Sequence, residues 1–566
     1  MKKLLLLGII SFVFFSCTED FVTKVPLGTL SNTTLYENPA NCQLAVNAIY
    51  DPLGWEKMYQ VGMFAIGDVA SDDTYKGGGK TVSDYPSDQS EMYPIELLST
   101  SPLNSYITAM WESYYIGISR ANEMIYRTEG LESGNDGELY KQMRGEARFL
   151  RALFYFDMVR IWGPVPLIKE PLAPLAAENV GNRKDESDNN GRGQMQDIYD
   201  FIISELDAIQ NDLPWTWDEE NAGRASAAAV KSLLAKAYLY KADIFGNDNN
   251  EYEKSYLLAK EVIDDGRYEL EEKYQDVFDL NLENEYSDEF IFAIQFVSGS
   301  QTLRGGEGNI RPIYTAPRIY YPNASNNPQI DDKYGYGFNM PTQGLVDAFD
   351  SADPRLDMII AENDSLFCHA FAATDPYWIR IGKTEFSSGY YCLKGTANWD
   401  KLNRSQVVGK NIPVIRLADV YLIAAEAGFK DGKYTGEALS YVNAIRERAR
   451  NSSDVNIETV KSQFQKNRDG LVINDNHPPA KLTSIDLDDI RLERRLELYG
   501  EGHRFFDLVR WSFDDDNYGN TVLTGMSVDV IGNPITYNPE TEGRFPIPQT
   551  QISLHTGGNL EQNKGY

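Results

Sequence analysis

The chain has 566 residues, 42% of them hydrophobic, which is enough for a large core in one big domain or in two closely packed ones. It carries 84 acidic and 53 basic residues, and the resulting net charge of −31 repels phosphate backbones. Nucleic acid is therefore excluded as an expected partner.

The first 16 residues have the composition of a bacterial signal peptide. Two lysines precede an apolar run that is too short to cross about 30 Å of hydrocarbon as a helix. The run ends at Ser16 and Cys17, which resemble a lipobox, and the acidic pair Glu19 and Asp20 follows. This resemblance predicts a signal peptide over 1–16 and lipidation at Cys17. Two or more acyl chains would then hold the protein stably at a membrane. An ordinary secreted protein is the alternative.

Apolar residues then recur at helical spacing in pairs of segments. Two less regular pairs come first, 104–129 with 138–162, and 196–213 leading into a helix that Ser226 would cap. Clear stripes follow at 230–238 and 256–263, and the same plan returns at 417–425 and 438–445. Each of the last two pairs fills a little over 34 residues and has alanines where helices must approach closely. This pattern predicts tetratricopeptide-type helical hairpins.

One helical segment, 147–162, is apolar on nearly every side, which predicts burial between layers. By contrast, 68–103 and 298–396 are aperiodic and rich in Gly, Pro, Asn and Tyr. Such long loops in a compact protein are usually functional or disordered, and their aromatic content argues against disorder. The GGGKT segment at 77–81 lacks the first glycine of a phosphate-binding loop, so we interpret it as a flexible loop.

Catalytic motifs are missing from the sequence. The four histidines form no HExxH pair, and no GxSxG or CxxC occurs, so His503 is interpreted as a hydrogen-bonded structural residue. The charged residues at 491–497 are interpreted as solvated or interlocking ion pairs on a helix. No cofactor or metal is expected, apart from a weak calcium hypothesis at Asn247, Asn249 and Glu251. The remaining cysteines suit no disulfide framework, although one Cys368–Cys392 bridge stays open.

Four segments resemble the SusD/RagB family: 145–167, 414–427, 490–511 and 544–566. The DVASDDTY motif at 68–75 fits as well, and Lys564 stands where proline is common in the family. The resemblance implies an all-α, mainly helical fold with tetratricopeptide-like hairpins and long loops that carry the ligand site. The implied regions are 17–300, with the tetratricopeptide-like helices, and 301–566, with loop-rich 301–400 and helices over 414–511.

The resemblance also implies a lipid anchor on the exterior of a Gram-negative, Bacteroidetes-type cell, with a SusC-like TonB-dependent transporter beneath the protein. A pyranose ring offers an apolar face and a rim of hydroxyls, so aromatic rings and polar forks would hold it. The two loop-rich stretches supply such groups, and the predicted ligand-binding residues are Asp73, Tyr75, Lys76, Tyr85, Tyr93, Tyr314, Arg318, Tyr320 and Tyr321, with Tyr334 and Tyr336 beside them. Asp72 and Asp73 have a structural alternative as turn-capping residues.

These observations predict a non-enzymatic, cell-surface lipoprotein that captures an oligosaccharide or polysaccharide and delivers it to the transporter. One alternative keeps the architecture and changes the cargo to peptides, as in RagB-like proteins. Another is a glycoside hydrolase, because two carboxylates that meet in space leave no sequence signature. A pure interaction scaffold without a small ligand is the third.

Overall fold

The computed structural model describes residues 34–36, 38–79, 81–172, 180–184, 187–280, 286–297, 308–318, 320–322, 335–361, 365–368, 377–381, 388–397, 407–452, 460–461, 474–555 and 560–566. The predicted signal peptide, the lipidation residue Cys17 and Tyr334 lie outside these ranges. Within them, no helix combines the length and the apolarity that crossing a bilayer requires.

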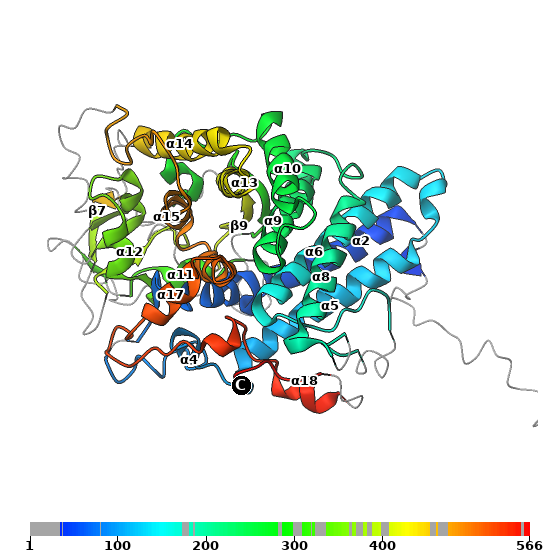
Figure 1. Ribbon diagram of the computed structural model, residues 1–566, viewed down its shortest axis with the longest axis horizontal. Coiled ribbons are helices and arrows are strands. Elements are labelled where there is room, and N and C mark those ends of the chain that lie inside the picture. The colour runs from blue at the N-terminus through cyan, green and yellow to red at the C-terminus, as the bar shows by residue number, and fades with distance from the viewer. Residues whose placement is uncertain are drawn as a thin grey trace, which may run out of the picture.

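The fold is mainly helical, as predicted (Figure 1). The helices are α2 (Pro39–Tyr50), α3 (Gly62–Phe64), α4 (Tyr93–Glu96), α5 (Ser105–Arg127), α6 (Gly137–Trp162), α8 (Arg192–Asp207), α9 (Ala227–Phe245), α10 (Glu251–Asp265), α11 (Arg311–Thr315), α12 (Gln343–Ala348), α13 (Leu417–Asp431), α14 (Thr435–Asn451), α15 (Leu487–Leu498), α16 (Arg504–Trp511), α17 (Tyr518–Gly525) and α18 (Gln549–Leu554).

Local signals set several helix ends. Ser226 caps α9 as predicted, because its hydroxyl accepts a hydrogen bond from the Ala229 N–H at 3.1 Å. Asp486 and Asp489 form a reciprocal capping box at the start of α15. Gly163 ends α6 with φ +72°, a conformation that favours glycine.

The longer helices pack in series, α5 on α6, α6 on α8, α8 on α9 and α9 on α10. The series then continues from α10 to α13 and α14, although these helices lie far apart in the sequence (Figure 1). Tyr256 of α10 stacks on Tyr434, with ring centroids 3.9 Å apart, and so fixes this junction. The arrangement is consistent with the predicted tetratricopeptide-type hairpins.

The 147–162 part of α6 is enclosed on nearly all sides, as its apolar composition predicted. It packs against α2, α5, α8 and α9. Its last residue, Trp162, lies edge-on to Trp111 of α5 at a centroid distance of 5.3 Å. This helix therefore forms the centre of the largest hydrophobic core.

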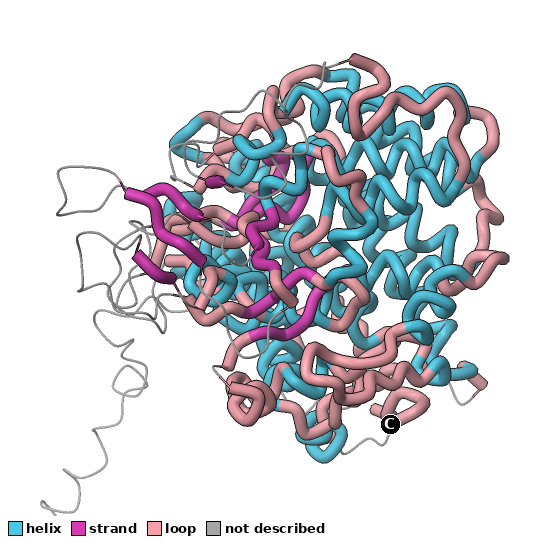
Figure 2. The backbone as a smooth tube through the Cα atoms, turned by 90° about the vertical axis from the view of Figure 1, so that its left-hand side faces the viewer, coloured by secondary structure: helices cyan, strands magenta, loops and turns pink. Residues whose placement is uncertain are grey.

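The strands form small antiparallel sheets that gather to one side of the helical stack (Figure 2). They are β1 (Thr74–Gly77), β2 (Phe290–Ile294), β3 (Tyr320–Pro322), β4 (Phe338–Pro341), β5 (Ile359–Ala361), β6 (Ser365–Cys368), β7 (Tyr377–Ile381), β8 (Tyr390–Cys392), β9 (Ile412–Arg416) and β10 (Val460–Lys461). The pairings are β1 with β4, β2 with β9 and β5 with β8, and the fourth sheet has the order β10-β6-β7-β3. Cys392 is a buried free thiol, so the bridge that the sequence left open is not formed.

A buried ion-pair network holds the C-terminal helices to the rest of the molecule. Glu497 of α15 accepts hydrogen bonds from Arg416 at 2.9 Å, from Arg355 at 3.4 Å and from Arg448. All four side chains are at most 5% exposed, so the charges are screened little by water. The predicted ion pairs at 491–497 are thus interlocking and buried rather than solvated.

Candidate functional site

The β1–β4 ladder joins the two loop-rich stretches that the sequence singled out. Thr74 pairs with Pro341 and Gly77 pairs with Phe338. We call the surrounding residues the loop cluster, which comprises residues 74–79, 81–96, 311–318 and 335–341. Six of the nine predicted ligand-binding residues lie in it: Tyr75, Lys76, Tyr85, Tyr93, Tyr314 and Arg318.

Lys76 and Tyr85 form the buried floor of the loop cluster. The Lys76 ammonium is fully buried, donates to the carbonyls of Gly77 and Asp88 at 2.8 and 2.9 Å, and lies 4.4 Å from the Tyr85 ring centroid. The Tyr85 hydroxyl donates to Glu96 at 2.8 Å. Both side chains therefore support the loops from within and are not placed to touch a ligand.

Burial also sets the protonation of this floor. Loss of hydration raises the pKa of Glu96 to about 7, even though the hydroxyl of Tyr85 and the backbone N–H of Lys76 donate to its carboxylate. Burial likewise lowers the pKa of Lys76 to about 8, despite the nearby carboxylates. The loop cluster thus holds an acid and a base that both titrate near neutral pH.

Two of the predicted residues, Arg318 and Tyr314, connect the two stretches through their side chains, and Tyr93 contacts a residue outside both. Arg318 forms an ion pair with Asp88 at 3.0 Å, and Tyr314, which is buried, accepts a hydrogen bond from Gln89 at 3.3 Å. The Tyr93 hydroxyl donates to Asp529 at 2.7 Å and lies on the rim of the cluster. These contacts confirm that the stretches lie together.

Tyr75, Tyr93 and Tyr336 are the tyrosines of the loop cluster whose rings stay partly exposed. Tyr93 lies edge-on to Tyr85 at 5.7 Å, and Tyr336 lies edge-on to Tyr314 at 5.4 Å. Tyr93 and Tyr336 are thus each packed against a buried ring. Tyr320 and Tyr321 belong to β3, but their side chains lie outside the described part of the structure.

Asp73 requires a correction, because it is buried in an ion pair. Its carboxylate accepts from Arg495 at 2.6 Å, while its neighbour Asp72 pairs with Arg504 at 2.8 Å and with Arg495 at 3.1 Å. The structural alternative therefore describes both residues better, although arginines of the C-terminal helices take the place of a turn cap. The DVASDDTY motif ties the N-terminal part of the chain to α15 and α16.

The glycine run after β1 is also tighter than the flexible loop that we predicted. Gly77 has φ +74°, and a Cβ there would lie 2.1 Å from the Gly337 carbonyl oxygen. The N–H groups of Gly78 and Gly79 donate to Gly337 and to Asp88. These donors are used within the protein, in line with the sequence argument against a phosphate-binding loop.

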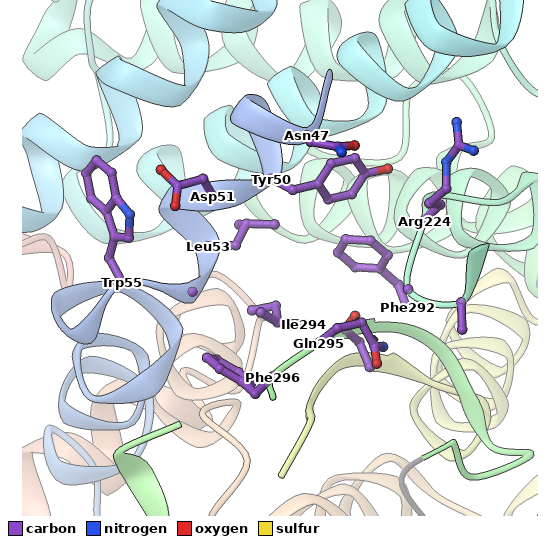
Figure 3. Close-up of a pocket in the computed structure, with 14 residues that line it drawn as sticks. Asn47, Tyr50, Asp51, Leu53, Trp55, Arg224, Phe292, Ile294, Gln295 and Phe296 are labelled. Carbon is purple, nitrogen blue, oxygen red and sulfur yellow. Dashed lines mark hydrogen bonds between the residues drawn. The ribbon is translucent and has the colours of Figure 1, made fainter. Parts of the chain in front are cut away.

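A pocket of about 360 Å³ is lined by residues outside the loop cluster and was not predicted from the sequence (Figure 3). Trp55 stands at one end and Arg224 at the other, with Leu53 and Phe292 between them. A second pocket of about 400 Å³ continues it past Arg224 and Gln295. No motif links the contributing segments, and only the lone Trp55, in the segment that follows α2, offered a signal.

The residues of the calcium hypothesis lie at the start of α10. Asn247 accepts a hydrogen bond from the Tyr252 N–H at 3.0 Å, and Glu251 accepts from the Asn249 N–H at 2.8 Å. The Asn247 oxygen thus serves the first turn of α10, and the Glu251 carboxylate serves the turn that precedes it. In the part of the chain that the structure describes, no group of three His, Cys, Asp or Glu side chains is arranged to hold a metal ion.

His503 is half-buried, and its Nδ1 accepts a hydrogen bond from the Lys236 ammonium at 3.4 Å. Burial holds the pKa of this imidazole well below its usual value. The interpretation of His503 as a hydrogen-bonded structural residue is confirmed.

Two family models match the chain. The SusD family matches residues 288–566, and a family described as starch-binding and associating with the outer membrane matches residues 53–239. A SusD-like protein of Bacteroides ovatus is 26% identical over 94% of this chain and 87% of its own length. The starch-binding protein SusD of Bacteroides thetaiotaomicron is 25% identical over 83% of this chain and 80% of its own length.

Solved structures share the fold. Surface glycan-binding protein A from Bacteroides fluxus superposes with a TM-score of 0.70, is 24% identical, and is matched over 94% of this chain and 100% of its own. The homologous protein from Bacteroides thetaiotaomicron, solved in complex with laminarihexaose, has a TM-score of 0.67 and 23% identity, with 93% of this chain and 99% of its own covered.

Proposed function

The chain belongs to the SusD/RagB family, and we propose from this that it is a non-enzymatic, cell-surface lipoprotein that captures an oligosaccharide. It would pass its cargo to a SusC-like TonB-dependent transporter in the outer membrane. The names of the relatives support this proposal, because they include a starch-binding protein and surface glycan-binding proteins.

The observation that carries the proposal is the pairing of exposed and buried aromatic rings in the loop cluster. Tyr75, Tyr93 and Tyr336 expose part of their rings, while Tyr85 and Tyr314 hold two of them from below. A platform of this kind suits the apolar face of a pyranose ring. Arg318, which is ion-paired with Asp88, would order the sugar hydroxyls.

Binding of the mature protein to glycan and peptide panels tests the cargo. In Tyr93→Ala and in Tyr336→Ala we expect the glycan Kd to rise about ten-fold, which corresponds to about 1.4 kcal/mol of lost aromatic contact. Tyr126→Ala is the matched control, because this tyrosine is 57% exposed on α5. Binding to peptides alone would favour the RagB-like alternative, and shortening of the bound glycan on long incubation would favour a hydrolase.

The anchor and the partner are tested separately. Metabolic labelling with a fatty acid should mark the native protein and not Cys17→Ala, which should also leave the membrane fraction. A SusC-like transporter should copurify with the anchored protein in mild detergent. Wild-type protein found without acyl chains in the periplasm would contradict the proposed location.

A further inference from the structure

The pocket in Figure 3 and its neighbour form one groove that the proposed function does not use. Both pockets are lined by Ala222, Gly223, Arg224, Ala293 and Gln295. Each volume, about 360 and about 400 Å³, lies in the range of about 300–1,000 Å³ that is usual for small-ligand sites. The groove is therefore long enough for a chain of linked units rather than for one small molecule.

Aromatic side chains give the groove an apolar floor. Phe292 and Phe296 line the first pocket and are nearly inaccessible, and Trp55 stands partly exposed at one end of it (Figure 3). Trp217 lines the second pocket, where the Arg224 guanidinium lies 4.1 Å from its ring centroid and the Ala225 carbonyl accepts its N–H at 2.8 Å. Trp55 and Trp217, which stay partly exposed, provide the flat surfaces, and a ring already held in place loses little side-chain freedom on binding.

A polar pair stands at the rim beside Trp55. Asn47 and Asp51 are four residues apart at the end of α2, and both side chains are exposed. The Asn47 carbonyl oxygen accepts from Gln43 at 3.0 Å, which leaves its amide N–H groups directed to solvent or ligand. Asp51 accepts from Arg120 at 3.1 Å, and a carboxylate can accept about four hydrogen bonds. Adjacent donors and acceptors of this kind match neighbouring hydroxyl groups.

The charges around the groove favour a neutral ligand. Arg224 donates its Nε to Glu146 at 3.0 Å and its Nη1 to Asn221 at 2.8 Å, so the guanidinium is already occupied. Arg267, which lines the second pocket, pairs with Asp265 at 3.2 Å. Asp51 and Asp288 line the groove as acids, and the whole chain carries a charge of −31. An anionic ligand would meet repulsion here, because the arginines that line the described part of the groove are already paired with acids.

The edge of β2 argues against a peptide added as an extra strand. The Ala293 carbonyl, which faces the junction of the two pockets, already accepts from the Gln295 amide at 3.2 Å. Gly223 covers the same place, since a Cβ there would lie 2.3 Å from Gln295 Cγ. Strand addition needs free backbone groups along such an edge.

We propose that this groove is a second carbohydrate-binding site, which takes a neutral oligosaccharide with its sugar faces on Trp55 and Trp217 and its hydroxyls on Asn47 and Asp51. The inference rests on the proposed function for its ligand class but concerns residues outside the loop cluster. Two sites on one chain would hold a long glycan by multivalent contact, which raises its apparent affinity without new contacts at either site.

Titration calorimetry on the mature protein with laminarihexaose and with maltohexaose tests the proposal. We expect two binding events for a neutral hexasaccharide that binds, and Trp55→Ala should weaken one of them at least about ten-fold. Asn47→Ala should weaken the same event without touching the core, which guards against misfolding of the tryptophan variant. Tyr126→Ala should leave both events unchanged. A charged hexasaccharide of galacturonic acid should bind the groove more weakly than the neutral one.

The results separate this inference from the proposed function. If hexasaccharide binding is lost in Tyr93→Ala and Tyr336→Ala but is unchanged in Trp55→Ala and Asn47→Ala, the groove proposal is overturned and the proposed function stands. If the groove variants alone abolish binding, the groove is the glycan site and the role of the loop cluster is overturned. The neutral-sugar assignment would be overturned if the charged sugar bound more tightly than the neutral one, or if only peptides bound, and if Trp55→Ala removed that binding.

Discussion

The ion-pair network around Glu497 and the loop cluster around Glu96 each bury a carboxylate, yet they shift its pKa in opposite directions. Burial raises the pKa in both places, but at Glu497 the arginines 448, 416 and 355 outweigh it and lower the pKa to about 2. At Glu96 the neighbours are too weak to offset burial, and the pKa rises to about 7. The network is therefore a fixed structural device, while the loop cluster stays responsive to solution conditions.

Removing the acid from the network should cause the largest loss of stability. Glu497→Ala leaves the buried Arg355, Arg416 and Arg448 without the carboxylate that they share. We therefore expect the free energy of unfolding to fall by about 3–5 kcal/mol. Urea unfolding measures this loss. Glu437→Ala, on the exposed face of α14, should change the value by less than about 0.5 kcal/mol. Equal losses in the two variants would show that the network contributes nothing special.

The loop cluster should be more sensitive to its backbone than to its charges. Gly77→Ala combines a positive φ with a contact of 2.1 Å to the Gly337 oxygen, and we expect a cost of about 2–4 kcal/mol. Gly432→Ala is the control, because φ there is +80° but nothing lies within 4 Å, which leaves about 1–2 kcal/mol of strain. A smaller loss for Gly77→Ala than for Gly432→Ala would contradict tight packing of β1 on β4.

The smallest expected effect is a change in pH dependence. Between about pH 4.5 and pH 7 the folded protein keeps a proton on Glu96 that the unfolded chain releases, so this residue makes stability fall as pH rises through that window. Glu96→Gln removes this trend. Relative to the variant, we expect wild-type protein to lose roughly 1–3 kcal/mol between pH 5 and pH 8. Unfolding curves at both values test this, and parallel changes in the two proteins would refute it.

Glu497 has the opposite dependence, which sharpens the contrast. Its pKa is lower in the folded protein than in the unfolded chain, so its contribution is complete above about pH 4.5 and is lost as the pH falls toward 2. Lowering the pH should therefore destabilise the network around Glu497, whereas protonation of Glu96 stabilises the loop cluster.

Much of the fold followed from local patterns. The apolar stripe at 230–238 and the cap at Ser226 predict α9 without reference to the rest of the chain. The apolar segment at 147–162 likewise predicted a central helix. The partners of Glu497 could not be predicted in this way. Arg355 and Arg416 come from distant segments, and nothing in their local sequence shows that they turn inward.

The candidate site was predicted less well, for a physical reason. The residue composition of the two loop-rich stretches correctly indicated loops that lie together in the fold. It could not show whether an amphipathic side chain such as Tyr85 lies under the surface or on it. Only the packing of Lys76 over its ring and the hydrogen bond from its hydroxyl to Glu96 show that Tyr85 lies under the surface. The groove beside Trp55 was missed because Phe292 and Arg224 reach it from separate segments that share no motif.

The contact between α10 and α13 also constrains how the protein is made. About 150 residues separate the two helices, and contacts between such distant parts of a chain form slowly. During synthesis the stack from α5 to α10 can assemble early, but the flank of α10 that carries Tyr256 must wait uncovered until Tyr434 emerges. The late pair α13 and α14 thus covers a surface of α10 that formed earlier during synthesis.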